Sequence, residues 1–174
     1  LDEYCMHRSI GLEIIQPISD DGHSISSSRI RELIQDGFVR RANFELGSVF
    51  GFMAVVIYGV GRGKELNFPT ANVIPVEKNQ LMPKPGVYFT RGRIIGLQAY
   101  GMCNFGTRPT FDEHELVLEI HFFHDELDNL YGKEIRVEFL ERIRDEKKFP
   151  SPEELKSQLQ KDKLRCLELQ GKYE

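Results

Sequence analysis

The sequence is poor in cysteine and has no long apolar run, and each shortage excludes a class of protein. Its three cysteines, Cys5, Cys103 and Cys166, are odd in number, far apart and without a C-x-x-C pair. This pattern argues against a disulfide framework or a structural zinc site and predicts a reducing compartment. Because no apolar run approaches the length that spans a bilayer, we expect no transmembrane helix.

The sequence also lacks an excess of basic residues. It carries 23 lysines and arginines against 27 aspartates and glutamates, for a formal net charge of −4. Such a chain has no bulk positive field to hold nucleic acid or an anionic membrane, so any phosphate chemistry must be local. The first ten residues carry both acidic and basic side chains and resemble neither a signal nor a transit peptide. We therefore expect a cytoplasmic protein.

The first part of the chain differs in pattern from the rest. Gly11–Ile18 predicts a short strand, and Ser26–Gly37 predicts a helix that begins at capping serines and ends at a glycine. Residues 38–46 predict a second short helix. One strand and two short helices cannot bury a core alone. We therefore expect residues 1–46 to be the tail end of one domain and residues 47–174 to form another.

From Ser48 onward the pattern is that of β-strands at short intervals, separated by turns rich in glycine and proline. One segment alternates strictly, with Leu118 and Ile120 on one face and Glu119 and His121 on the other. The spacing favours a small antiparallel barrel over a parallel α/β sheet. The predicted strands are Phe50–Tyr58, Val87–Ile95, Gln98–Asn104, Leu116–Phe123 and Ile135–Phe139.

The C-terminal segment predicts a helix. Ser151 is a typical N-cap, Pro152 suits the first helical position, and Glu154 follows the cap by three residues. An apolar stripe on this helix should pack on the barrel. The stripe consists of Leu155, Leu159, Cys166 and Leu167.

The stretch Gly59–Asn72 is the richest in candidate chemistry. Its alternate glycines, including Gly61 and Gly63, let successive backbone N–H groups turn toward an anion, and Arg62 and Lys64 add positive charge. The stretch fits neither a Walker A loop nor G-x-G-x-x-G, because other residues occupy the required positions. A flexible hairpin turn after a strand is the alternative interpretation.

Three side chains with oxygen atoms add to this signal. Thr70 and Asn72 follow Pro69 and present hard oxygens that suit Mg²⁺, although a turn capped by its own side chains would use the same residues. Glu119 lies in mid-strand among apolar neighbours and could serve as a general base or simply face water.

Other charged residues carry weaker signals. Arg108 and Arg144 could reach a phosphate or a ligand, although such charges are more often solvated. The five histidines show no spacing typical of metal ligands.

Taken in order, these motifs resemble the riboflavin kinase family, specifically the C-terminal module of the bacterial bifunctional riboflavin kinase/FMN adenylyltransferase. The resemblance covers about residues 47–174. The motifs are Gly61–Gly63 with Pro69–Asn72, Pro85–Tyr88, Asn104–Thr110, Leu118–His121 and Leu130–Phe139. Upstream, Ile25–Arg31 resembles the closing signature of the adenylyltransferase domain, in which Ser26, Ser27 and Arg29 would help to hold ATP phosphates.

The resemblance implies a mainly β fold: a six-stranded antiparallel Greek-key barrel with a C-terminal helix, preceded by a short α/β remnant of a nucleotidyltransferase domain. It implies Mg²⁺-dependent transfer of the ATP γ-phosphoryl group to the ribityl 5′-hydroxyl of riboflavin, giving FMN and ADP. It assigns ATP to Gly61, Arg62, Gly63, Lys64, Thr70 and Asn72, Mg²⁺ to Thr70 and Asn72, the base to Glu119, and riboflavin to Asn104, Arg108 and Arg144.

One residue departs from the family pattern, since Asn67 stands where we expect glycine. Two other functions compete with the kinase. A chain that also adenylylates FMN would need more than one signature helix, so we expect FMN but not FAD as the product, although the parent enzymes should make both. A non-catalytic oligonucleotide-binding barrel would need a basic groove with exposed aromatic residues. We expect a monomer whose partners are riboflavin and ATP, without nucleic acid or membrane.

Overall fold

The computed structural model describes residues 1–59, 63, 66–94, 96–109, 114–124 and 130–173, with side chains of residues 107–109 and 114–116 excepted. Most of the described chain is β-structure, with helices at both ends. The elements are α1 (Asp2–His7), β1 (Ser19–Asp20), β2 (His23–Ser24), α2 (Ser27–Gln35), α3 (Val39–Leu46), β3 (Gly51–Ile57), β4 (Ala71–Pro75), β5 (Gly86–Ile94), β6 (Leu97–Pro109), β7 (His114–Phe122), β8 (Glu134–Arg144) and α5 (Pro152–Gln170).

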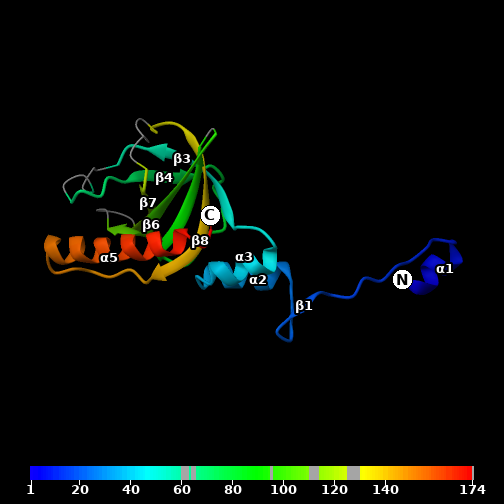
Figure 1. Cartoon of the computed structure of the whole chain (residues 1–174). Helices are drawn as coiled ribbons and strands as arrows, with labels where there is room; N and C mark the ends of the chain where they lie inside the picture. Colours follow the sequence, from blue (N-terminus) through cyan, green and yellow to red (C-terminus); the bar gives the residue numbers. More distant parts are fainter. Residues whose placement is uncertain (60–62, 64–65, 95, 110–113, 125–129, 174) are drawn as a thin grey trace.

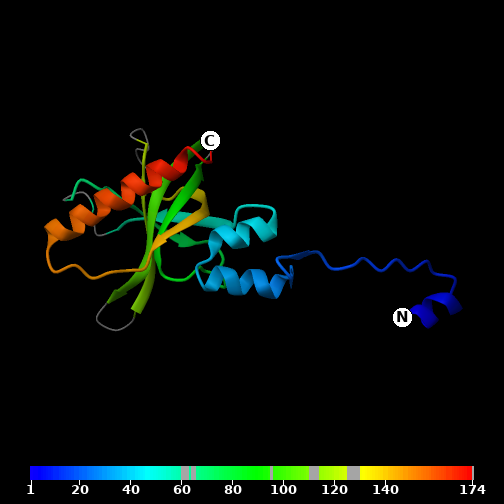
Figure 2. The same cartoon turned by 60° about the horizontal axis from the view of Figure 1, so that its bottom comes forward.

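Six of these strands form a closed antiparallel barrel in the order β3-β4-β7-β6-β5-β8. β3 pairs with both β4 and β8, so the sheet has no free edge. The connections β4 to β5 and β7 to β8 join strands that are not neighbours, as the Greek-key expectation requires. Figures 1 and 2 show α5 lying along the outside of this barrel, and α2 and α3 side by side at another part of its surface.

The barrel interior is filled by apolar side chains, so it leaves no channel. Phe52, Tyr88 and Phe139 pack in one aromatic cluster, with the ring of Phe139 5.3 Å from that of Tyr88 and 5.6 Å from that of Phe52. The inward face of β7 contributes the buried residues Leu118 and Ile120, as the alternation of that segment predicts. Among the described residues, the barrel interior is therefore a packed core.

The two helices α2 and α3 share the barrel's core. Ile34, Val39 and Ala42 are buried in the same cluster as the interior of the barrel. Asn43 strengthens this junction, because its side-chain amide donates to the carbonyl of Phe139 at 2.9 Å and accepts from the backbone N–H of Phe50 at 2.7 Å. Buried residues on both sides of the expected domain limit at residue 46 therefore belong to one apolar cluster.

Helix α5 closes a second apolar cluster against the outside of the barrel. It begins as expected, with the Ser151 hydroxyl accepting the backbone N–H of Glu154 at 3.2 Å. Leu159, Cys166 and Leu169 face the barrel. Leu167 is 42% exposed and is not part of this cluster, so its assignment to the apolar stripe was wrong. The helical repeat that carries Cys166 inward places Leu169, rather than Leu167, on the same face.

Two other expectations about elements need correction. Residues 11–18 form no strand, and the apolar side chains of Ile14 and Ile15 are exposed; within the described chain, this segment has no neighbouring strand to pair with. Conversely, β4 was missed, because the segment that includes Thr70 and Asn72 reads as a turn and ends in a proline. The starts and ends of α2 and α3 are confirmed, including Gly47 in the left-handed region.

All three cysteine side chains are buried and free of disulfide bonds. Burial, with a further contribution from the charge of Glu119, raises the pKa of the Cys103 thiol above its ordinary value, and burial raises the pKa of Cys166 to about 12. Among the helices that the structure describes, none is long and apolar enough to cross a membrane.

Candidate functional site

The register of the barrel strands places five residues in one row on its outer face. Asn72 on β4 pairs with Glu119 on β7, and Glu119 pairs in turn with Asn104 on β6. The row continues through Val87 on β5 to Arg144 on β8. Directly opposed residues on neighbouring antiparallel strands have Cβ atoms about 4.5–5.5 Å apart, so polar groups remote in sequence become neighbours.

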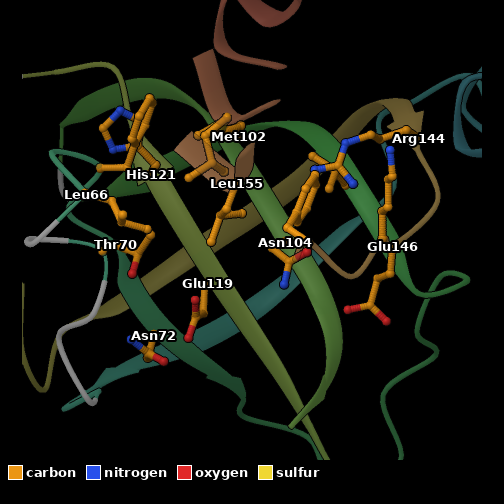
Figure 3. A pocket seen from close by; sticks show the side chains of 16 residues that line it. Leu66, Thr70, Asn72, Met102, Asn104, Glu119, His121, Arg144, Glu146 and Leu155 are labelled. Carbon is orange, nitrogen blue, oxygen red and sulfur yellow. The ribbon is translucent and has the colours of Figure 1, made fainter. Parts of the chain in front are cut away.

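This row forms the floor of a pocket of about 350 Å³ between the barrel and α5. Figure 3 shows Thr70, Asn72 and Glu119 together at one end, Arg144 and Glu146 at the other, and Asn104 between them. The helix supplies an apolar wall from Leu155 and Leu159, and the segment before it supplies Glu146, Lys147 and Phe149. The pocket is therefore a long slot with polar groups at both ends and an apolar side.

The end of the slot near Asn72 is built by close backbone packing. Asn72 is only 5% exposed, and a Cβ on Gly59 would overlap its side-chain amide. A Cβ on Gly63 would likewise overlap the carbonyl oxygen of Phe68 and lie 3.3 Å from the Thr70 hydroxyl. Glycine is needed at both positions for this reason, rather than for a positive φ. Gly59 and Gly63 thus pack directly on the segment from Phe68 to Asn72.

Asn67 also has a conformational explanation. Its φ angle is +63°, in the left-handed region that glycine adopts without cost and that asparagine tolerates better than most residues. The departure from the expected glycine therefore preserves the backbone shape of this turn.

The opposite end of the slot is held by a buried ion pair between β8 and α5. Asp162 is 2% exposed. Its carboxylate accepts from Nε of Arg144 at 3.0 Å and from Nη2 at 2.7 Å, and it also accepts from the Gln158 amide at 2.8 Å. The Arg144 Nη1 donates to the carbonyl of Asp145, and its guanidinium lies 5.8 Å from the ring of Phe149. This network fixes the guanidinium at the pocket wall.

His121 lies two residues beyond Glu119 on the same outer face and also lines the pocket. Its Nδ1 is 2.8 Å from the carbonyl oxygen of Pro69, and its Nε2 is 3.4 Å from Nζ of Lys163 on α5. Burial lowers the pKa of this imidazole, the positive charge of Lys163 lowers it further, and the hydrogen bond to Pro69 opposes both. The net effect is a lowered pKa, which favours the neutral ring.

The structure brings together six of the residues that were singled out from the sequence. Gly63, Thr70, Asn72, Asn104, Glu119 and Arg144 all line the one pocket. Gly61, Arg62 and Lys64 lie outside the described residues, and of Arg108 only the backbone position on β6, opposite Glu115, is described.

Ser26, Ser27 and Arg29 do not line the pocket. Ser26 caps α2 by accepting the backbone N–H of Arg29, and the Arg29 side chain pairs with the buried carboxylate of Glu45 at 3.0 Å. Arg41 also donates to Glu45, at 2.7 Å. These contacts give Arg29 a structural role; the predicted role in holding ATP phosphates stays a prediction.

Sequence reasoning missed several residues that line the pocket or hold a lining residue in place. Asp162 could have been found from helical spacing, since it falls three residues after Leu159 and four before Cys166, on the inward face of α5. His121 was set aside because its spacing suits no metal. Glu146 and Phe149 carried no recognisable signal, because they belong to an irregular segment whose path depends on the packing of α5.

The side chains at the Asn72 end fit a small, hard cation such as Mg²⁺. The Thr70 hydroxyl, the Asn72 amide oxygen and the Glu119 carboxylate are oxygen donors at the same end of the pocket. Mg²⁺ usually takes only one or two protein ligands and completes its shell with water and substrate phosphates. Two neutral oxygens beside one carboxylate suit that mode of binding better than a closed cage of protein ligands.

Comparisons with known proteins agree with this arrangement. The family model described as Flavokinase: Riboflavin kinase matches residues 46–169. The bifunctional riboflavin kinase/FMN adenylyltransferase of Bacillus subtilis is 36% identical over 160 residues, which are 90% of this chain and 50% of that protein. The enzyme of the same name from Listeria monocytogenes is 39% identical over 141 residues, or 79% of this chain and 44% of that protein.

A solved structure supports the same fold. The crystal structure described as that of a macrolide-efflux protein from Streptococcus pneumoniae superposes with a TM-score of 0.85 at 33% identity, over 93% of this chain and 53% of that one. The chain spans about half the length of the curated relatives that it matches. From the extent of the family match, and from the pocket that unites its polar motifs, the chain belongs to the riboflavin kinase family.

Proposed function

We propose that this chain transfers the γ-phosphoryl group of ATP to the 5′-hydroxyl of the ribityl chain of riboflavin, giving FMN and ADP. The observation that carries the proposal is the row from Asn72 through Glu119 and Asn104 to Arg144, which lies in one pocket of a riboflavin kinase domain. Phosphoryl transfer asks a protein mainly for positioning and for neutralisation of charge. The Asn72 end of the slot would position the phosphates and neutralise their charge, and the Arg144 end would position the flavin.

At the Asn72 end, Gly63 and Thr70 line the space where the ATP phosphates would lie. Thr70 and Asn72 would hold Mg²⁺, which when bound neutralises phosphate charge. The residues themselves position the phosphates, since Asn72 is packed between Gly59 and β7 and cannot swing freely.

Glu119 sits between the two ends of the row and would act as general base. The attacking ribityl hydroxyl loses its proton to the Glu119 carboxylate as its oxygen bonds to the γ-phosphorus, and the bond to the β–γ bridging oxygen breaks to release ADP. A carboxylate oxygen within reach of the hydroxyl is a suitable acceptor for that proton.

The flavin ring would occupy the rest of the slot. Met102, Leu155 and Leu159 provide apolar surface, and Asn104 and Arg144 provide polar contacts at its edge. The rigid hold of Asp162 on Arg144 supports a fixed contact rather than an adaptable one. We also assign Arg108, on β6 beyond Asn104, to riboflavin binding, and Gly61, Arg62 and Lys64 to ATP.

The test is incubation of the purified chain with riboflavin, ATP and Mg²⁺, followed by chromatographic separation of riboflavin, FMN and FAD. We expect FMN without FAD, and no FMN when a chelator removes the metal. Absence of FMN under any metal condition would refute the kinase. Production of FAD from FMN and ATP would show that the adenylyltransferase signature near Ser26 is part of a working site.

A further inference from the structure

His121 makes contacts that neither the base, the metal site nor the flavin site requires. The carbonyl oxygen of Pro69 can only accept a hydrogen bond, so the Nδ1 atom 2.8 Å away must carry the hydrogen and donate. The Lys163 ammonium can only donate, so the Nε2 atom 3.4 Å away must offer its lone pair. One neutral tautomer of His121 satisfies both neighbours at once.

The surroundings of the ring keep it in this state. His121 is 6% exposed, and its ring lies edge-to-face against Phe68 at 5.2 Å and Phe123 at 5.8 Å. The Lys163 ammonium lies 6.0 Å from the Phe68 ring and 5.6 Å from the Phe123 ring, so the aromatic pair also fixes the donor. An additional proton on Nε2 would face the Lys163 charge in a buried site.

The carbonyl that His121 holds belongs to the peptide that leads into Thr70. On the other side of this segment, the backbone N–H of Phe68 donates to the carbonyl of Gly63 at 2.8 Å. The segment 68–70 is therefore hydrogen-bonded to Gly63 on one side and to His121 of β7 on the other. Rotation of the Pro69–Thr70 peptide would break one of these hydrogen bonds and turn the Thr70 side chain away from its present direction in the pocket.

We propose that His121 is a positioning residue: through its Nδ1–H it fixes the Pro69–Thr70 peptide, and so the Thr70 hydroxyl, at the end of the pocket that holds Asn72 and Glu119. Lys163 holds the imidazole in the required tautomer and thereby links α5 to the phosphate end of the pocket. The expected loss of kcat rests on the proposed function. The hydrogen bond from His121 to the Pro69–Thr70 peptide can be tested without it.

Two substitutions separate hydrogen bonding from packing. His121→Phe retains a ring of similar size but has no donor for the Pro69 carbonyl. His121→Asn loses the ring but places its amide nitrogen near the position of Nδ1, so it can still donate. Leu164→Ala is the control, because Leu164 adjoins Lys163 on α5 but is exposed and does not line the pocket.

The kinetic expectation follows from misplacement of a phosphate-positioning group. His121→Phe should lower kcat by roughly 10- to 100-fold, whereas His121→Asn should remain within about 5-fold of the parent. The Kd for riboflavin, which binds toward Arg144, should change less than about 2-fold in either variant. Leu164→Ala should leave kcat near that of the parent. If packing were the only role of His121, the order would reverse, with His121→Phe the milder change.

Nuclear magnetic resonance gives a readout that does not depend on turnover. The nitrogen shifts of the His121 ring should show a protonated Nδ1 and a bare Nε2 at neutral pH. The Thr70 amide should shift in His121→Phe and return toward its original position in His121→Asn, because a hydrogen bond to a carbonyl polarises the N–H of the same peptide.

A protonated Nε2 in the parent, or a Thr70 amide that is unchanged in His121→Phe, would overturn the inference. Equal kcat losses in the two folded variants would do so as well. If the parent makes no FMN, the proposed function fails, and the ring tautomer and the Thr70 amide still decide whether His121 positions the peptide. If His121→Phe does not fold, the kcat of His121→Asn and the nitrogen shifts of the parent ring still decide whether His121 positions the peptide.

Discussion

Glu119 is the residue on which the proposed chemistry depends most directly. Glu119→Gln keeps the shape and hydrogen-bonding capacity of the side chain but cannot take a proton. We expect kcat to fall by roughly 10²- to 10⁴-fold, the usual contribution of a general base. The Kd for riboflavin should change little, because the proton moves only during the reaction. Single-turnover kinetics and flavin fluorescence titration measure the two quantities.

A matched control is available on β8, where Glu134→Gln removes a similar carboxylate from an exposed position outside the pocket. That variant should turn over like the parent. A Glu119→Gln enzyme within a few-fold of the parent would mean that this carboxylate only faces solvent and that the base lies elsewhere.

Gly59 offers a test of the metal end that leaves every proposed ligand in place. A Cβ at this position would overlap the Asn72 amide, so Gly59→Ala must displace either the amide or the turn. We expect the Mg²⁺ concentration at half-maximal activity and the KM for ATP both to rise, as they should in Asn72→Ala. Gly171→Ala is the control, since a Cβ there meets nothing within 4 Å and its φ is −61°. Titration of activity with Mg²⁺ checks both; unchanged metal dependence in Gly59→Ala would argue against Asn72 as a ligand.

At the scale of elements, the junction between β8 and α5 depends on one buried carboxylate. Asp162→Asn removes the charge that pairs with Arg144 while keeping the volume of the side chain. Loss of hydrogen bonds between charged groups at a buried site should lower the free energy of unfolding by about 2 kcal/mol. The affinity for riboflavin should also fall, because Arg144 loses its anchor.

Urea denaturation and flavin titration measure these two effects of Asp162→Asn. Glu168→Gln provides the comparison on the same helix, since the Glu168–Arg165 pair is exposed at both ends and exposed pairs contribute at most about 1 kcal/mol. Equal stability of the two variants would show that Asp162 is not a structural anchor.

The elements differ in how far the sequence predicted them, and the difference is physical. Caps such as Ser151 and stops such as Gly47 are local, because the residues that form the hydrogen bond lie within a turn of each other. The alternation of β7 is also local, and it correctly separated Ile120 from Glu119. β4 was missed since its strand character comes from its pairing with β3 and β7, rather than from its own residues.

The candidate site shows the same division. Glu119, Thr70 and Asn72 were predictable as residue types within motifs, but their adjacency depends on strand register, which no single segment encodes. His121 gives the clearest example. Its role becomes visible only when Pro69 and Lys163, 52 and 42 residues away in sequence, are brought to opposite sides of its ring.

At the scale of the whole molecule, the unit that folds with the barrel should begin before residue 47. A chain that starts at Ser48 would lose Ile34, Val39 and Ala42 from the shared core. Each large aliphatic side chain that loses its burial costs about 1.5–3 kcal/mol, against a total stability of about 5–15 kcal/mol for an ordinary domain. We expect this shortened chain to unfold at much lower denaturant concentration or to aggregate.

A chain that starts at Ser19 is the control for this truncation. It removes α1 and the segment 8–18, which is exposed throughout and extends away from the barrel (Figure 1), and its denaturation midpoint should match that of the full chain. If the chain starting at Ser48 were as stable as the full one, the division at residue 46 would be a true domain limit.

The buried thiols of Cys103 and Cys166 can report whether α5 detaches before the barrel strands separate. A thiol reacts with alkylating reagents as the thiolate, and burial disfavours that form in both Cys103, inside the barrel, and Cys166, beneath α5. Detachment of α5 alone would expose Cys166, whereas Cys103 becomes accessible only when the barrel strands separate. The order in which mass spectrometry finds the two sites modified would therefore show whether the wall of the pocket can leave while the barrel stays closed.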